Sequence, residues 1–130
     1  MCEKTTLQHV ALQYTDSKKA DIFFTKILGL TLEKEFCLSE DLSNEIFQIR
    51  ENVDIKVYGN EQVTFEIFIS QKPKNIGYEH TCIEIQNKEK FIERCKRYNI
   101  KPMFVKKGEK TLLFVKDFSD NLFEIKEKQN

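Results

Sequence analysis

The sequence predicts an α+β fold in which one strand–helix–strands unit occurs twice. In both halves, a histidine precedes a proposed helix cap by seven residues: His9 before Asp16, and His80 before Asn87. Both halves also end in a strand whose centre reads Phe-Glu-Ile, at residues 65–67 and 123–125. Because order, spacing and residue type all agree, we interpret the chain as a duplication.

The first half is predicted to begin with a strand and a helix. Residues 6–14 alternate as a strand should. Asp16 is the expected N-cap of a helix over residues 17–29, and Gly29 would end it. Apolar residues recur at helical spacing in this segment: Ala20, Phe23, Phe24, Ile27 and Leu28. Further strands are predicted at 30–38, 44–50, 54–59 and 63–70, the last two joined by a turn.

The second half repeats this order after a polar stretch, residues 71–77, which we interpret as a linker. A strand is predicted at 78–85, and Asn87 would cap a helix over 88–99. The expected buried stripe of that helix is Phe91, Ile92, Cys95 and Tyr98. Strands at 102–107, 110–117 and 121–127 follow. We therefore expect a single domain, 1–130, with module one at about 6–70 and module two at about 78–127.

Composition excludes several classes of function. Acidic and basic residues balance at 21 each, so a concentrated basic surface for nucleic acid is not expected. No apolar run approaches the roughly 20 residues of a membrane span, and the N-terminal residues do not resemble a signal peptide. The four cysteines form no CxxC pair and are expected to be reduced thiols in the cytoplasm.

Strand alternation places four polar residues on faces that do not pack against helices. Glu66 opposes the apolar Phe65 and Ile67, and Glu124 opposes Phe123 and Ile125 in the same way. His9 and His80 oppose the apolar faces of their own strands. If the two sheets curl toward each other, His9, Glu66, His80 and Glu124 face a common trough. The same parity predicts that six further residues line a pocket: Ala11, Gln13, Thr64, Phe68, Cys82 and Glu84.

Two imidazoles and two carboxylates are a plausible ligand set for a divalent metal. Neutral histidine and carboxylate oxygens suit Zn, Ni, Co, Fe or Mn and leave positions for water or substrate. No tight spacing such as HxxxH is present, so the fold must bring these strand positions together. Alone, His9 would be interpreted as structural or exposed, and Glu66 as an ordinary polar-face residue.

The sequence resembles the vicinal-oxygen-chelate superfamily, which includes glyoxalase I, methylmalonyl-CoA epimerase, fosfomycin and bleomycin resistance proteins and extradiol dioxygenases. The opening segment at 9–30 is similar to that family's histidine strand and following helix. The segment at 116–125 is similar to its closing motif, with Phe118, Ser119 and the lack of a glycine as departures. The resemblance implies two tandem βαβββ modules that form a curved, half-barrel mixed sheet with helices outside. It also implies a homodimer in which sites can lie between subunits.

The complete His/Glu/His/Glu set resembles the glyoxalase I branch most closely. The resemblance implies a metal-dependent lyase or isomerase that moves a proton alpha to a carbonyl on a small molecule with vicinal oxygens. Glu124 is the expected base and Glu66 the second candidate. The alternatives are a non-catalytic, bleomycin-resistance-type binding protein and a methylmalonyl-CoA epimerase-like isomerase. Gln13 stands where glyoxalase I has an arginine that helps to hold glutathione.

Overall fold

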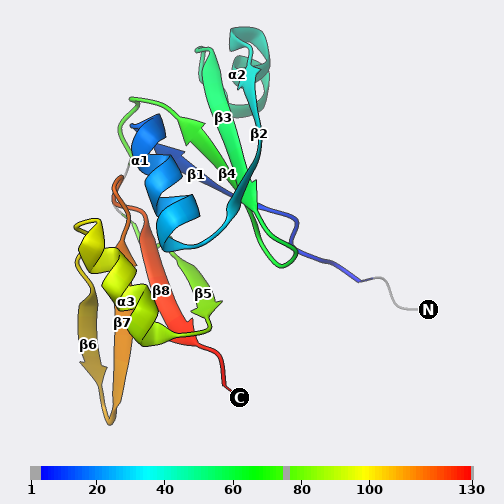
Figure 1. The fold of residues 1–130 in the computed structure, drawn as a ribbon. Helices are drawn as coiled ribbons and strands as arrows, with labels where there is room; N and C mark the ends of the chain where they lie inside the picture. The colour runs from blue at the N-terminus through cyan, green and yellow to red at the C-terminus, as the bar shows by residue number, and fades with distance from the viewer. Residues whose placement is uncertain (1–3, 75–76, 130) are drawn as a thin grey trace.

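The computed structural model describes residues 4–74 and 77–129, which form two four-stranded sheets (Figure 1). Module one contains β1 (Val10–Tyr14), α1 (Ser17–Asp21), η1 (Ile22–Ile27), β2 (Thr31–Leu38), α2 (Glu40–Phe47), β3 (Val53–Gly59) and β4 (Thr64–Ile69). Module two contains β5 (Thr81–Ile85), α3 (Lys88–Arg97), β6 (Met103–Lys107), β7 (Lys110–Lys116) and β8 (Leu122–Glu127). None of the described helices is long and apolar enough to cross a membrane.

The two sheets have the same topology. Their strand orders are β1-β4-β3-β2 and β5-β8-β7-β6. In each sheet the first and last strands of the module pair in parallel, and the remaining neighbours pair antiparallel. This correspondence confirms the α+β fold of tandem βαβββ modules. It also explains the repeated Phe-Glu-Ile, because β4 and β8 occupy the same place in their sheets.

Side-chain caps begin the first helix of each module at the predicted residues. The Asp16 carboxylate accepts hydrogen bonds from the backbone N–H groups of Lys18 and Lys19, at 2.9 and 3.1 Å. The Asn87 side chain accepts one from the N–H of Lys90 at 3.0 Å. Each cap satisfies N–H groups that have no partner inside the helix. The helix that follows each histidine-bearing segment therefore begins with the same kind of side-chain cap.

The predicted helix over 17–29 changes type along its length. Its first part is α-helical, but Ile22–Ile27 forms a π-helix, in which the N–H of Leu28 bonds to the carbonyl oxygen of Phe23. Phe23 and Phe24 are adjacent, yet both are fully buried. The wider turn of a π-helix brings consecutive side chains closer in direction, which allows both rings to face the core. Periodicity alone does not distinguish this turn from an α-helix.

The prediction of a strand at 44–50 is wrong. Residues 40–47 form α2, and Gln48 ends it in the left-handed region with a φ of 57°. Ser39 caps this helix by accepting a hydrogen bond from the N–H of Leu42 at 3.2 Å, and two acidic residues stabilise its first turn. The short alternation in this segment fits both strand and helix patterns, and the cap at Ser39 was the missed signal.

Aromatic side chains join the two modules into one core. Phe23 of η1 lies 5.1 Å from Phe123 of β8 between ring centroids, and Phe65 of β4 lies 6.0 Å from Phe123. The guanidinium Nε of Arg94 on α3 donates a hydrogen bond to the Ile27 carbonyl at 2.9 Å. The helix-facing sides of both sheets therefore bury one shared cluster. Their opposite faces, which carry the candidate ligands, remain outside this core.

The turn between β7 and β8 also connects the modules. The Asn121 amide donates to the Gln13 carbonyl at 3.1 Å, and the N–H of Thr15 donates to Ser119 Oγ at 3.1 Å. Asp117 is buried beneath this turn and accepts hydrogen bonds from the N–H groups of Ser119 and Asn121. The end of β1 is thus fixed against module two.

Candidate metal centre

The first histidine–glutamate pair lies entirely in module one. His9 precedes β1 by one residue, and Glu66 lies at the centre of β4, whose backbone pairs in parallel with β1. The parallel register matches Ala11 with Glu66 and so brings the start of β1 near this carboxylate. His9 Nε2 lies 3.4 Å from Glu66 Oε1, with 38% and 24% of the two side chains exposed. Both groups are accessible from solvent.

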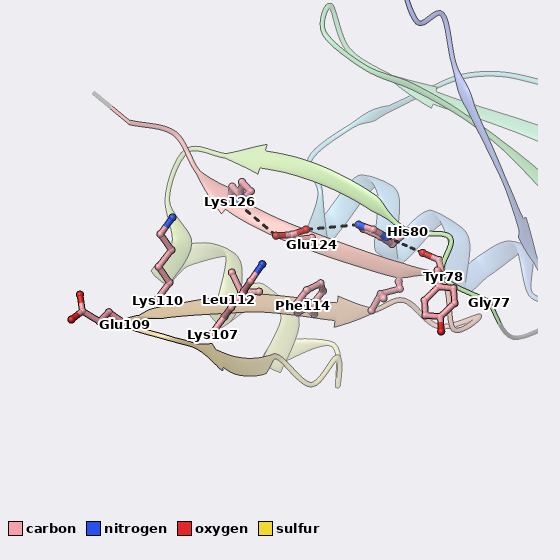
Figure 2. Close-up of a pocket in the computed structure, with 11 residues that line it drawn as sticks. Gly77, Tyr78, His80, Lys107, Glu109, Lys110, Leu112, Phe114, Glu124 and Lys126 are labelled. Atoms are coloured by element: carbon pink, nitrogen blue, oxygen red, sulfur yellow. Dashed lines mark hydrogen bonds and ion pairs between the residues drawn. The ribbon is translucent and has the colours of Figure 1, made fainter.

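The second pair repeats this geometry in module two. His80 precedes β5, and its Nε2 lies 3.8 Å from Oε1 of Glu124 on β8. The other ring nitrogen, Nδ1, lies 2.9 Å from the Tyr78 carbonyl oxygen (Figure 2). A carbonyl oxygen only accepts hydrogen bonds, so this contact favours a proton on Nδ1. In the neutral form with its proton on Nδ1, the imidazole has an unprotonated Nε2 on the side of Glu124, as a metal ligand requires.

A hollow of about 920 Å³ opens over this second pair. His80 and Glu124 lie in its wall, and Leu112, Phe114 and Leu122 contribute apolar surface. Lys126 also lines it, and its Nζ is 3.6 Å from Glu124 Oε2. Glu124 therefore interacts with an imidazole through one oxygen and an ammonium group through the other, as Figure 2 shows.

One chain forms two pairs rather than a four-residue cluster. In the described residues, no group of three or more His, Cys, Asp and Glu side chains is placed to hold a metal ion. The single trough expected from strand parity is thus not formed within one chain, and the two pairs lie on separate sheet faces, one in each module. Each face offers one imidazole nitrogen and one carboxylate, which is half of the predicted ligand set.

The six predicted pocket residues separate between the modules. Ala11, Gln13 and Phe68 line a smaller pocket of about 210 Å³ in module one, partly covered by Phe47 of α2. Thr64 lies half-buried at the start of β4. Cys82 and Glu84 are exposed on β5. The structure thus brings three of the six together.

Two of these residues have environments that limit their roles. Gln13 Nε2 donates a hydrogen bond to the Lys72 carbonyl at 2.5 Å, so this side chain is bound to the linker. Cys82 is in register with Glu124. Desolvation, and then the Glu124 charge, raise the pKa of the Cys82 thiol. A raised pKa disfavours the thiolate and hence a nucleophilic role.

Three lysines that line the hollow are absent from the residues predicted for the pocket. Lys126 is two residues beyond Glu124 on the same strand, so strand parity already places both on one face. Lys107 and Lys110 also line the hollow, and they are cross-strand partners in the hairpin of β6 and β7. The signal that could have found them was the two-residue turn between the predicted strands at 102–107 and 110–117, because it pairs Lys107 with Lys110.

The donor atoms fit a divalent cation. Imidazole nitrogen with carboxylate oxygen is a ligand combination common to Zn and to other first-row metals. His80 has its second nitrogen held by a backbone carbonyl, as expected for an oriented ligand. His9, Glu66, His80 and Glu124 would supply the donors. A single pair leaves a metal under-coordinated, and two pairs together would give four protein ligands.

Comparison with known proteins finds similarity in structure but not in sequence. The chain matches no protein-family model, and no curated protein is significantly similar to it. A glyoxalase family protein from Bacillus cereus has a TM-score of 0.72 at 13% identity, covering 100% of this chain and 99% of that one. A glyoxalase family protein from Enterococcus faecalis gives a TM-score of 0.71 at 19% identity over 92% of this chain and 95% of that chain.

The fosfomycin resistance protein FosX from Listeria monocytogenes has the same fold. A FosX mutant with one glutamate replaced by glutamine, in complex with Mn(II) and 1S,2S-dihydroxypropylphosphonic acid, gives a TM-score of 0.71 at 18% identity. That match covers 95% of this chain and 90% of FosX. FosX and the glyoxalase family proteins are members of the vicinal-oxygen-chelate superfamily. The fold that the sequence resemblance implies is therefore confirmed.

Proposed function

We propose that this protein is a metal-dependent lyase or isomerase of the glyoxalase I type, which acts on a small molecule with two neighbouring oxygens. The observation that carries the proposal is the repeated histidine–glutamate pair, at 3.4 Å in module one and 3.8 Å in module two. The metal would be Zn, Ni, Co, Fe or Mn, and the Mn(II) in the similar FosX structure supports a divalent ion.

The active unit in this proposal is a homodimer. His9 and Glu66 of one chain would join His80 and Glu124 of its partner around each metal. The edge strands of the sheets support this arrangement, because β1 and β5 each end their sheet and each follows one of the two histidines. An edge strand leaves backbone groups free to pair with another chain.

The bound metal would polarise the two substrate oxygens and stabilise an enolate-like oxyanion. This chain would supply the proton transfer. Glu124 is the proposed base because it lies in the large hollow and is only 18% exposed. Glu66 is the second candidate for this role.

Subunit mixing tests the shared site directly. His9→Ala/Glu66→Ala lacks the module-one pair, and His80→Ala/Glu124→Ala lacks the module-two pair. Each double variant alone should bind no stoichiometric metal by elemental analysis after supplementation. When the two are unfolded together and refolded, half of the dimers are mixed, and each has one intact site. Metal content should therefore recover to about a quarter of the wild-type value.

A matched control and two contrary results make this test decisive. Glu84→Ala removes an exposed carboxylate from β5 outside both pairs and should leave metal content unchanged. A mixture that stays free of metal would contradict the shared site, provided that size-exclusion chromatography shows dimers. A wild-type protein that binds none of Zn, Ni, Co, Fe or Mn would contradict the proposal as a whole.

A second candidate is a binding protein without turnover, of the bleomycin-resistance type. The observation in its favour is Gln13, which replaces the glutathione-binding arginine and is hydrogen-bonded to Lys72 instead.

The hemithioacetal of methylglyoxal and glutathione is the probe that separates the candidates. Turnover by metal-loaded protein supports the glyoxalase I reaction itself. If no turnover of the hemithioacetal is found, the exchange of C–H for C–D in hydroxyacetone, in deuterated water, still distinguishes proton transfer from binding alone. An epimerase-like isomerase would also catalyse such exchange.

A further inference from the structure

The hollow of module two has a polarity gradient along its length. His80 lies at one end, beside Tyr78, and the hairpin of β6 and β7 forms the other end (Figure 2). Phe114 is in register with Glu124, and Lys110 lies four residues farther along β7. At a strand rise of about 3.3 Å per residue, the backbone of Lys110 is roughly 13 Å along the strand from the pair of Phe114 and Glu124. Leu112 provides apolar surface between the two ends.

Three lysines line the hollow on the hairpin side of His80: Lys107 and Lys110 in the hairpin itself, and Lys126 next to Glu124. Lys107 and Lys110 are cross-strand partners in the hairpin, and Lys126 of β8 lines the same hollow. Among the described residues, Lys107 and Lys110 have no carboxylate within 4.0 Å, and Lys126 contacts only Glu124. Glu109 is also at the rim, but Figure 2 shows its carboxylate directed away from Glu124. This end is therefore cationic without an internal counter-ion for two of its lysines.

We propose that the substrate carries an anionic group, a carboxylate, phosphonate or phosphate, which Lys107, Lys110 and Lys126 hold while its vicinal oxygens lie at His80 and Glu124. This inference rests on the proposed function for the position of the vicinal oxygens. Like-charged ammonium groups on neighbouring strands repel each other, and an anion between them relieves that repulsion. If Glu124 served as a metal ligand, Lys126 would be available to the anion in place of its present ion pair with Glu124. The apolar surface between the ends suits a short aliphatic spacer.

An anion titration tests the lysine cluster without any metal. Methylphosphonate and propionate are added separately to metal-free, 15N-labelled protein, with sodium chloride at matched ionic strength as the reference. Saturable NMR shifts are expected in the amides of the hairpin and of Lys126. Lys107→Met/Lys110→Met should weaken this binding by at least about threefold. Lys90→Met/Lys96→Met removes two exposed lysines from α3 and should leave it unchanged.

Two hydroxamates then test the link to the metal. Butanohydroxamate and succinomonohydroxamate chelate through the same two neighbouring oxygens and have similar length, but only the second has a terminal carboxylate. Co(II)-loaded protein should bind the acidic compound about threefold to tenfold more tightly, measured from its visible spectrum at low salt. Lys107→Met/Lys110→Met should remove this preference and leave the affinity for butanohydroxamate unchanged.

The outcomes separate this inference from the proposed function. Localised anion binding that depends on the hairpin lysines supports the inference, even if the protein binds no metal and the proposed function fails. Shifts that are absent, scattered, or equal in both double variants overturn the inference, even if metal binding succeeds. Equal affinity for the two hydroxamates also overturns it. A stronger response to methylphosphonate than to propionate assigns the anion to the phosphorus class, and the reverse assigns it to the carboxylate class.

Discussion

The two glutamates of the pairs occupy equivalent strands but have different surroundings. Glu124 lies in the 920 Å³ hollow and contacts Lys126, whereas Glu66 lies on the face of the 210 Å³ pocket and has no such lysine contact among the described residues. The duplicated modules therefore carry similar histidine–glutamate pairs, of which only the pair in module two lies in the larger hollow.

Glu124→Gln should lower proton transfer more than Glu66→Gln. At metal saturation, we expect a loss of about 10²-fold or more for Glu124→Gln, which is the typical contribution of a general base. The measurement is the rate of deuterium incorporation into hydroxyacetone, followed by NMR. Cys82→Ser, next to Glu124 in register, is the matched control and should stay near the wild-type rate. A larger loss in Glu66→Gln would transfer the role of base to module one.

At the residue scale, strand parity predicted which polar side chains leave the core. Glu66 and Glu124 do oppose fully or almost fully buried neighbours. Parity did not predict that one chain holds the four residues as two pairs, because it fixes the face of a strand but not the distance between sheets. The pairing of Lys107 with Lys110, in contrast, was available from the sequence, because the two-residue turn at 108–109 fixes the register of this hairpin.

The helix caps are elements that local sequence predicts well. Asp16 and Asn87 both accept the expected backbone hydrogen bonds, because capping needs only a short polar side chain before a helix. Segment 44–50 was mistaken for a strand because its apolar residues are few and their alternation is ambiguous. The π-helical turn of η1 was not predictable, since burial of both Phe23 and Phe24 depends on the tertiary core.

Asp16→Ala should lower the free energy of unfolding by about 1 kcal/mol, because two N–H groups of α1 lose their acceptor. Asp16→Ser keeps a capping oxygen and should remain close to the wild type. Urea denaturation followed by circular dichroism measures both variants. An unchanged stability in Asp16→Ala would show that packing of η1, rather than the cap, fixes the start of this helix.

For the whole molecule, the connection between modules is predicted to depend on pH through Asp117. Burial raises the pKa of this carboxyl above its ordinary value of 3.8, although hydrogen bonds from Asn121 and Ser119 oppose the shift. The folded state therefore binds this proton more tightly than the unfolded state does. The stability from this group is present below the ordinary pKa and is lost as pH rises through the raised value.

Asp117→Asn replaces the titrating carboxyl with a neutral group of similar shape. Relative to this variant, the wild type should become less stable as pH rises above about 4, measured by urea denaturation at a series of pH values. Asp21→Asn is the contrasting variant. Desolvation of Asp21 is outweighed by hydrogen bonds from Lys56 and Tyr58, so the pKa of this carboxyl is lowered. Relative to Asp21→Asn, the wild type should therefore become more stable as pH rises. A constant difference between wild type and Asp117→Asn across this range would contradict the raised pKa.

The repeat was predictable at this scale because it is written in sequence order and spacing. The shared aromatic core was not, since it depends on how η1 packs between the modules. Each histidine nevertheless meets its glutamate inside its own module, so neither pair depends on the peptide link between them. Exchanging the order of the modules along the gene, by circular permutation, would therefore leave both half-sites intact.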